Sequence, residues 1–81
     1  MRPKYDEVLA GLTKILHEVA GVPVEDVRPE KSFGDELDID SLTLVEVLLM
    51  VEEQFEVRIP DDDALGLKTV EDTVSYILAR G

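Results

Sequence analysis

The sequence predicts an all-α fold: a four-helix bundle with three main helices, one short helix and a long loop between helices one and two. Apolar residues recur at helical spacing over three segments, residues 4–20, 41–56 and 69–80. The run 57–60 is too short for a sheet strand and has no partner strand in the sequence. A chain of 81 residues allows one small domain, which we place over residues 1–81.

The first expected helix covers residues 4–20 and has one apolar stripe. Asp6 and Glu7 lie in its first turn, where the helix dipole favours negative charge. Gly21 and Pro23 are typical of a helix end. The residues of the stripe are Val8, Leu12, Ile15, Leu16 and Val19.

A long connection follows over residues 21–40 and contains Pro29 and Gly34. A loop of this length in a small domain is usually functional or fixed to the core. Scattered apolar residues favour fixation, and the expected anchors are Val22, Val24, Val27, Phe33 and Leu37.

The second expected helix runs from residue 41 to residue 55 or 56 and is apolar on two sides. The presumed core side holds Leu44, Val47, Leu48, Val51 and Phe55. The opposite side combines Leu42, Val45 and Leu49 with four glutamates, Glu46, Glu52, Glu53 and Glu56. Unpaired buried carboxylates are very costly, so this side is not buried in the domain and is interpreted as a docking strip for a partner. The alternative, that its apolar residues are scattered surface residues without a role, stays open.

Two shorter elements complete the expected fold. A short helical turn is expected over residues 61–66, ended by Gly66. Thr69 then caps a last helix that extends to Arg80, with Asp72 at the position of a capping box. The apolar stripe of this helix comprises Val70, Val74, Ile77 and Leu78.

Negative charge is concentrated in one third of the chain. The formal net charge is −11, and residues 35–63 contribute −10 of it, with eleven acids and one base, Arg58. Such a segment repels nucleic acid and anionic membranes and attracts basic protein surfaces, whereas solubility alone does not require clustering. No apolar run approaches the roughly 20 residues that span a bilayer, and the acidic start does not resemble a signal peptide. We therefore expect a soluble, cytoplasmic, monomeric protein that does not bind nucleic acid and does not insert into membranes.

Ser41 opens the second expected helix between acidic residues and has no catalytic base beside it. The only histidine, His17, lies midway along the first helix, and there is no Gly-x-Ser-x-Gly motif. Cysteine is absent, and the acids match no calcium loop, so neither catalysis by the chain itself nor a dedicated metal site is predicted. Ser41 is most simply a helix N-cap. If Asp40 or Asp38 caps the helix instead, Ser41 projects outward. A phosphate ester on it would then lie at the positive end of the helix dipole, although the surrounding acids oppose it.

The segment Asp40-Ser41-Leu42 resembles the attachment motif of acyl carrier proteins. The similarity extends in register over nearly the whole chain and is closest to actinobacterial fatty-acid carriers. Two positions depart from the common pattern: Ile39 stands where many relatives have a small residue, and Thr43 where many have an acid or serine. The matching segments are residues 29–33, 36–42, 45–46, 52–55, 59–61, 68–70 and 76–77.

The resemblance implies a function for these residues. Ser41 would carry a 4′-phosphopantetheine arm that a phosphopantetheinyl transferase installs from coenzyme A, reading Asp40 and Leu42 beside it. The thiol of this arm would hold the acyl chain, so the protein would be a substrate of enzymes and not itself an enzyme. The residues expected to dock onto basic patches of those enzymes are Asp40, Leu42, Glu46, Leu49 and Glu53. The residues expected to line the acyl pocket are Phe33, Leu44, Leu48, Val51, Ile59 and Ala64.

The partners that the resemblance implies are acyltransferases, ketosynthases, reductases and dehydratases of fatty-acid synthesis. Relatives in meromycolate synthesis carry a C-terminal extension that this sequence does not show, so we expect general fatty-acid synthesis. Two alternatives stay open: a carrier for polyketide or other specialised metabolism, and an acidic protein-interaction module in which Ser41 is only a helix N-cap.

Overall fold

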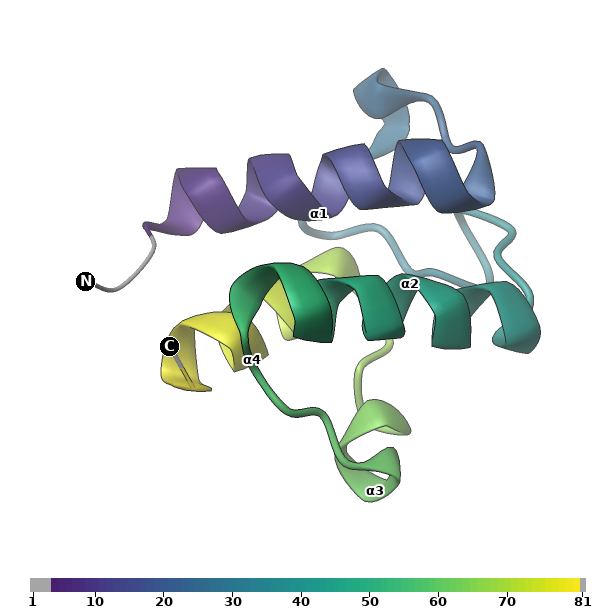
Figure 1. Ribbon diagram of the computed structural model, residues 1–81. Helices are drawn as coiled ribbons and strands as arrows, with labels where there is room; N and C mark the ends of the chain where they lie inside the picture. Colours follow the sequence, from purple (N-terminus) through teal and green to yellow (C-terminus); the bar gives the residue numbers. More distant parts are fainter. Residues whose placement is uncertain (1–3, 81) are drawn as a thin grey trace.

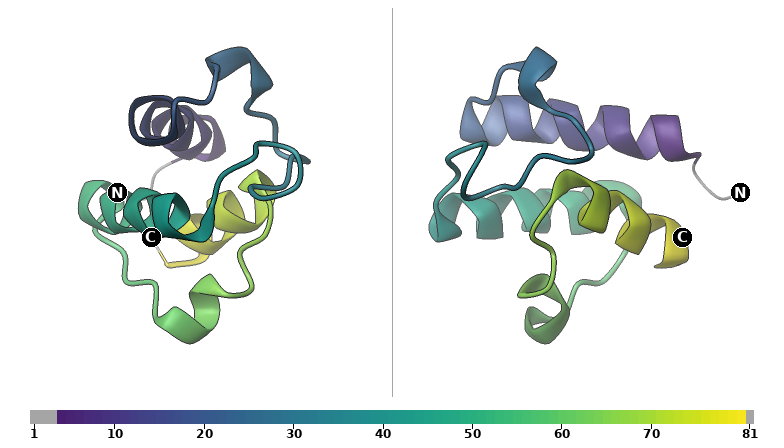
Figure 2. Two further views of the ribbon diagram at one scale, coloured as in Figure 1. Left: turned by 90° about the vertical axis from the view of Figure 1, so that its right-hand side faces the viewer. Right: turned by 180° about the vertical axis from the view of Figure 1, so that it is seen from behind.

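The computed structural model describes residues 4–80 and contains four α-helices and one short 3₁₀ turn within them. The helices α1 and α2 run antiparallel, α4 packs against α1, and the short α3 lies on the far side of α2 from α1 (Figures 1 and 2). This arrangement confirms the predicted all-α bundle with its long loop. The bounds are α1 (Tyr5–Ala20), η1 (Val24–Asp26), α2 (Ser41–Phe55), α3 (Asp61–Ala64) and α4 (Val70–Arg80).

One apolar core lies between the three main helices. The predicted stripes supply most of it, because residues three and four apart on a helix share one side. Thr73, which the sequence did not single out, is also buried, and its hydroxyl donates to the Thr69 carbonyl at 3.4 Å. The outer stripe residues Val19, Leu44, Phe55 and Leu78 are only partly buried against this core. The buried stripe residues are Val8, Leu12, Ile15, Leu16, Val47, Leu48, Val51, Val70, Val74 and Ile77.

The helix ends follow local sequence rules in most places. Gly21 ends α1 at φ 71°, where glycine has no Cβ to clash. A capping box opens α4, as predicted: the Asp72 N–H donates to Thr69 Oγ1 at 3.0 Å, and the Asp72 carboxylate accepts the Thr69 N–H at 3.1 Å. The short helix is an exception, since α3 ends at Ala64 instead of extending to Gly66.

The long loop is fixed to the start of α4 by main-chain hydrogen bonds. The Phe33 N–H donates to the Lys68 carbonyl at 2.9 Å, and the Val70 N–H donates to the Lys31 carbonyl at 3.0 Å. The Lys31 carbonyl of the loop therefore accepts the Val70 N–H, which has no partner within α4 because it lies in the first turn of that helix. Together with its buried side chains, these bonds confirm that the loop is part of the packed structure.

One expected loop anchor is wrong. The side chain of Val24 is 53% exposed, because Val24 opens the 3₁₀ turn η1, which the sequence reading treated as plain loop. Ile39 serves as an anchor instead: it is buried, and its N–H donates to the Phe33 carbonyl at 2.8 Å.

A tyrosine–carboxylate hydrogen bond joins α1 to α4. The Tyr5 O–H donates to Glu71 Oε1 at 2.6 Å, and the Ser75 hydroxyl donates to Glu71 Oε2 at 2.8 Å. These bonds, that of Tyr5 first, favour the ionised carboxylate and hold the pKa of Glu71 below its ordinary value of 4.5. The same bond raises the pKa of Tyr5 above its ordinary value of 10.0.

Replacing Tyr5 with phenylalanine should lower the free energy of unfolding only within a defined pH window. The depressed pKa of Glu71 means that its contribution is present above pH 4.5 and is lost as the pH falls through the folded-state value. The raised pKa of Tyr5 means that its contribution is present below pH 10.0 and is lost as the pH rises. Urea unfolding of wild type and Tyr5→Phe across pH should show the largest difference in the free energy of unfolding near neutral pH. If that difference kept the same size down to acidic pH, the Tyr5–Glu71 hydrogen bond would not be its cause.

Candidate functional site

Asp40, and not Ser41, caps α2. The Thr43 N–H donates to Asp40 Oδ1 at 2.8 Å, while Ser41 is the first residue inside the helix and is exposed. The N-cap reading of Ser41 is therefore wrong, and the alternative of an interaction module built on that cap loses its basis. Asp38 does not cap; it takes the left-handed conformation at φ 55°, which Asp tolerates better than most residues.

The Ser41 hydroxyl is available to an incoming reagent and has no activating base beside it. Within residues 4–80 it makes no hydrogen bond. Hydrogen bonds from Thr43, first of all from its backbone N–H, hold the pKa of the neighbouring Asp40 carboxyl below its usual value, so this carboxylate is a poor general base. His17 Nδ1 lies 3.0 Å from the Val22 carbonyl oxygen, to which it must donate. The geometry fits a serine that another protein modifies.

A strip of exposed residues extends from Ser41 along α2. Leu42 is 72% exposed and Leu49 is 58% exposed. Glu46 and Glu53 are also exposed, and the spacing of four, three and four residues places these side chains on one side of the helix. We call Asp40, Leu42, Glu46, Leu49 and Glu53 the α2 strip. Sequence reasoning missed exposed Met50, which had been assigned to neither side of the helix.

The carboxylates of the α2 strip are not neutralised by the chain's own bases. Within residues 4–80, the two ion pairs are Lys31–Glu36 at 3.6 Å and Arg80–Asp63 at 3.4 Å, and neither includes a strip residue. The same residues bring no three acidic or histidine side chains together as a metal site. The strip therefore presents uncompensated negative charge interrupted by two exposed leucines.

Two hollows lie beside α2, on the side of α3. The larger, of about 310 Å³, is lined by the loop, by α2 and by the segment after α3; the smaller, of about 70 Å³, lies between α2 and α3. Ala64 lines both hollows. The larger is lined by Ser32, Phe33, Gly34, Asp35, Leu44, Ala64, Leu65, Leu67 and Lys68. The smaller is lined by Val45, Leu48, Leu49, Glu52, Ile59, Asp61 and Ala64.

Five of the six expected pocket residues line these hollows: Phe33 and Leu44 the larger, Leu48 and Ile59 the smaller, and Ala64 both. Val51 is fully buried in the core and lines neither. Sequence reasoning missed Leu65, which is 79% exposed at the rim of the larger hollow.

Comparisons with known proteins agree with this site. The family model described as "Phosphopantetheine attachment site" matches residues 10–77. An acyl carrier protein of Acidothermus cellulolyticus is 60% identical over 72 residues, covering 89% of this chain and 86% of that protein. A meromycolate extension acyl carrier protein of Mycolicibacterium smegmatis is 49% identical over 77 residues, covering 95% of this chain and 78% of that protein.

A solved structure agrees as well. The acyl carrier protein from Enterococcus faecalis superposes with a TM-score of 0.82 at 29% identity, covering 98% of this chain and 100% of that one. Among residues 4–80, no helix combines the length and apolar character that crossing a bilayer would require. The resemblance seen in the sequence is thus confirmed over most of the chain. The chain belongs to the acyl carrier protein family, whose members are carriers with a phosphopantetheine attachment site and not enzymes.

Proposed function

We propose that Ser41 is the residue to which the 4′-phosphopantetheine arm is attached, and that residues 1–81 act as one carrier domain. The observation that carries this proposal is the Asp40 cap, which leaves an exposed serine at the N-terminus of α2. The positive end of the helix dipole favours the phosphodiester there. When bound, the arm supplies the thiol that the chain lacks, since the sequence contains no cysteine.

The two hollows beside α2 are proposed as the shelter of the acyl chain. Their combined lining is mainly apolar, and the larger hollow reaches the lower end of the volumes usual for ligand pockets. Ala64 lines both hollows, so they meet at this residue of α3. Val51 would meet an acyl chain only if the helices part and the chain enters the core.

The α2 strip is proposed as the surface that partner enzymes bind. Basic patches on a phosphopantetheinyl transferase, and on acyltransferases, ketosynthases, reductases and dehydratases, would match its negative charge. The leucines of the strip would add apolar contact at the centre of the interface. We place the protein, as a monomer, in the cytoplasm with these enzymes.

Fatty-acid synthesis is the pathway that we favour. The relatives from Acidothermus cellulolyticus and Thermobifida fusca, at 60% and 54% identity, are named simply as acyl carrier proteins. Meromycolate extension is a second candidate, because mycobacterial carriers of that name are 49% identical. No observation on the structure favours polyketide synthesis.

The test is to load the purified chain with a phosphopantetheinyl transferase and octanoyl-coenzyme A, and then to locate the adduct by fragmentation mass spectrometry. We expect one octanoyl-phosphopantetheine group on Ser41, and neutral hydroxylamine should remove the octanoyl group alone. Ser41→Ala should stay unmodified, whereas the matched variant Ser75→Ala should be modified like wild type. An adduct on another residue would overturn the assignment.

A further inference from the structure

The short helix α3 forms one wall of the smaller hollow but has little structure of its own to hold it in place. It has four residues, and its main-chain hydrogen bonds are all local: the Ala64 N–H donates to the Pro60 carbonyl at 2.9 Å, and the Leu65 N–H donates to the Asp61 carbonyl at 3.2 Å. Asp61 and Ala64 line the hollow from α3, and the facing wall belongs to α2. The views place α3 away from α1, outside the three-helix core (Figures 1 and 2).

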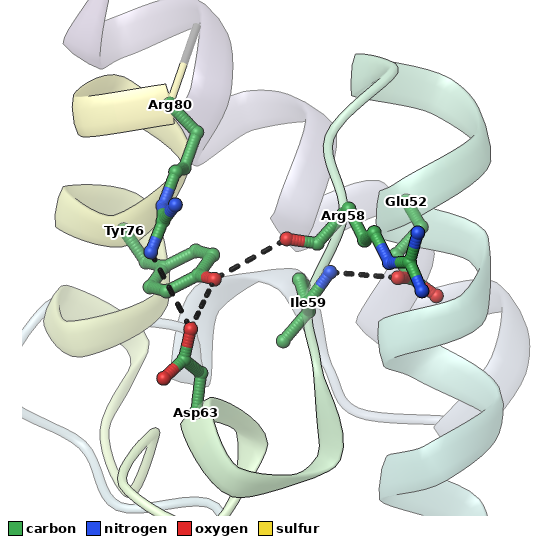
Figure 3. A network of polar contacts seen from close by, with 6 residues as sticks. All are labelled: Glu52, Arg58, Ile59, Asp63, Tyr76 and Arg80. Carbon is green, nitrogen blue, oxygen red and sulfur yellow. Dashed lines mark hydrogen bonds and ion pairs between the residues drawn. The ribbon is translucent and has the colours of Figure 1, made fainter.

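Two side chains of α4, Tyr76 and Arg80, contact Asp63 of α3. The Tyr76 hydroxyl lies 2.7 Å from Asp63 Oδ2 and 3.2 Å from the Arg58 carbonyl oxygen (Figure 3). Arg80 lies 3.4 Å from the same Asp63 oxygen, and its guanidinium carbon is 4.7 Å from the centre of the Tyr76 ring. One hydroxyl thus contacts both α3 and the connector that leads into it.

The connector is held to α2 as well. The Glu52 carboxylate accepts the Ile59 N–H at 2.7 Å (Figure 3), and both residues line the smaller hollow. Neither Tyr76 nor Arg80 lines either hollow. Tyr76 therefore acts on the hollow indirectly, through Asp63 on α3 and through the Arg58 carbonyl of the connector.

We infer that Tyr76 is a positioning residue which, by holding α3 through Asp63, sets how long an acyl chain can extend into the smaller hollow between α2 and α3. This inference rests on the proposed acyl shelter. At about 70 Å³ the smaller hollow is well below the 300–1,000 Å³ of ordinary ligand pockets, so a longer chain enters only if α3 moves away from α2. The contacts of Asp63 with Tyr76 and Arg80 oppose that movement.

The test compares Tyr76→Phe with a matched variant, Tyr5→Phe, which also loses a tyrosine–carboxylate hydrogen bond but lies away from α3. Each protein is loaded on Ser41 with hexanoyl, octanoyl, decanoyl and dodecanoyl groups, and the rise in melting temperature over the unacylated form is recorded. In wild type the rise should level off along the series. In Tyr76→Phe it should continue to longer chains, and in Tyr5→Phe it should follow the wild-type pattern.

Amide hydrogen exchange gives a second readout that does not depend on the acyl group. In unacylated Tyr76→Phe, the Ala64 amide should exchange about fivefold faster, the factor expected for one lost side-chain hydrogen bond. A merely structural role would lower all melting temperatures equally and leave the acyl-dependent rises unchanged, which would overturn the inference. Failure of Ser41 to load would instead count against the proposed function, so the two failures are distinguishable.

Discussion

Reversing two charges of the α2 strip, with Glu46→Lys and Glu53→Lys together, should slow acyl transfer onto the carrier by about tenfold to a hundredfold, the lower part of the roughly 10- to 1,000-fold range that electrostatic steering contributes. Both carboxylates are exposed and have no ion-pair partner within residues 4–80. A partner with a basic patch would meet like charge, which weakens binding and lowers the association rate. The measurement is kcat/KM of a carrier-dependent acyltransferase with each protein as its substrate.

A matched control separates the position of the charges from their number. Glu18→Lys with Glu25→Lys changes the net charge by the same amount on exposed residues of α1 and η1. This control should keep nearly the wild-type kcat/KM. Added salt should lower the wild-type value, because screening weakens exposed charge pairs. Equal slowing by both variants would show that only net charge matters, and the docking assignment would then be wrong.

Phe33→Ala should cost about 3–5 kcal/mol of the free energy of unfolding, as is usual for removing a buried phenylalanine side chain. For 81 residues, typical stabilities of ~0.05–0.15 kcal/mol per residue give a total of about 4–12 kcal/mol. Phe33 is 1% exposed, and its N–H bond to the Lys68 carbonyl ties the loop to the segment before α4. The variant should therefore lose a large share of its stability, and if the wild type lies at the lower end of this range it should unfold at 25 °C.

Urea unfolding followed by circular dichroism measures this cost. Phe33→Leu keeps most of the apolar volume and should cost less, roughly 1–1.5 kcal/mol. If Phe33→Ala also lost only about 1 kcal/mol, comparable to an ordinary substitution, the loop would not be held by this side chain.

Local patterns in the sequence predicted the helices and their buried sides well. The stripes of α1, α2 and α4 and the Thr69–Asp72 capping box depend on residues within four positions of one another, which the helical repeat brings together. The alternation of leucine and glutamate on α2 likewise predicted which side of that helix is exposed.

Features that depend on distant segments were not predictable in this way. Asp40 and Ser41 are both good capping residues, and only the backbone conformation at Asp40 decides which of them caps. Val24 and Ile39 are equally apolar, and the pairing of the loop with Lys68 and α4 decides which is buried. An apolar residue such as Val51 has the same sequence signature whether it lies in the core or beside a hollow.

The central claim is that this chain carries its chemistry on a thiol that its sequence does not encode. A thiol titration with a chromogenic disulfide tests it directly, because a chain without cysteine gives no background. The purified unmodified protein should contain no thiol, and treatment with coenzyme A and a phosphopantetheinyl transferase, followed by removal of coenzyme A, should produce one thiol per chain. Ser41→Ala should remain at zero under the same treatment. A wild-type protein that stays at zero, or a Ser41→Ala variant that gains a thiol, would contradict the account.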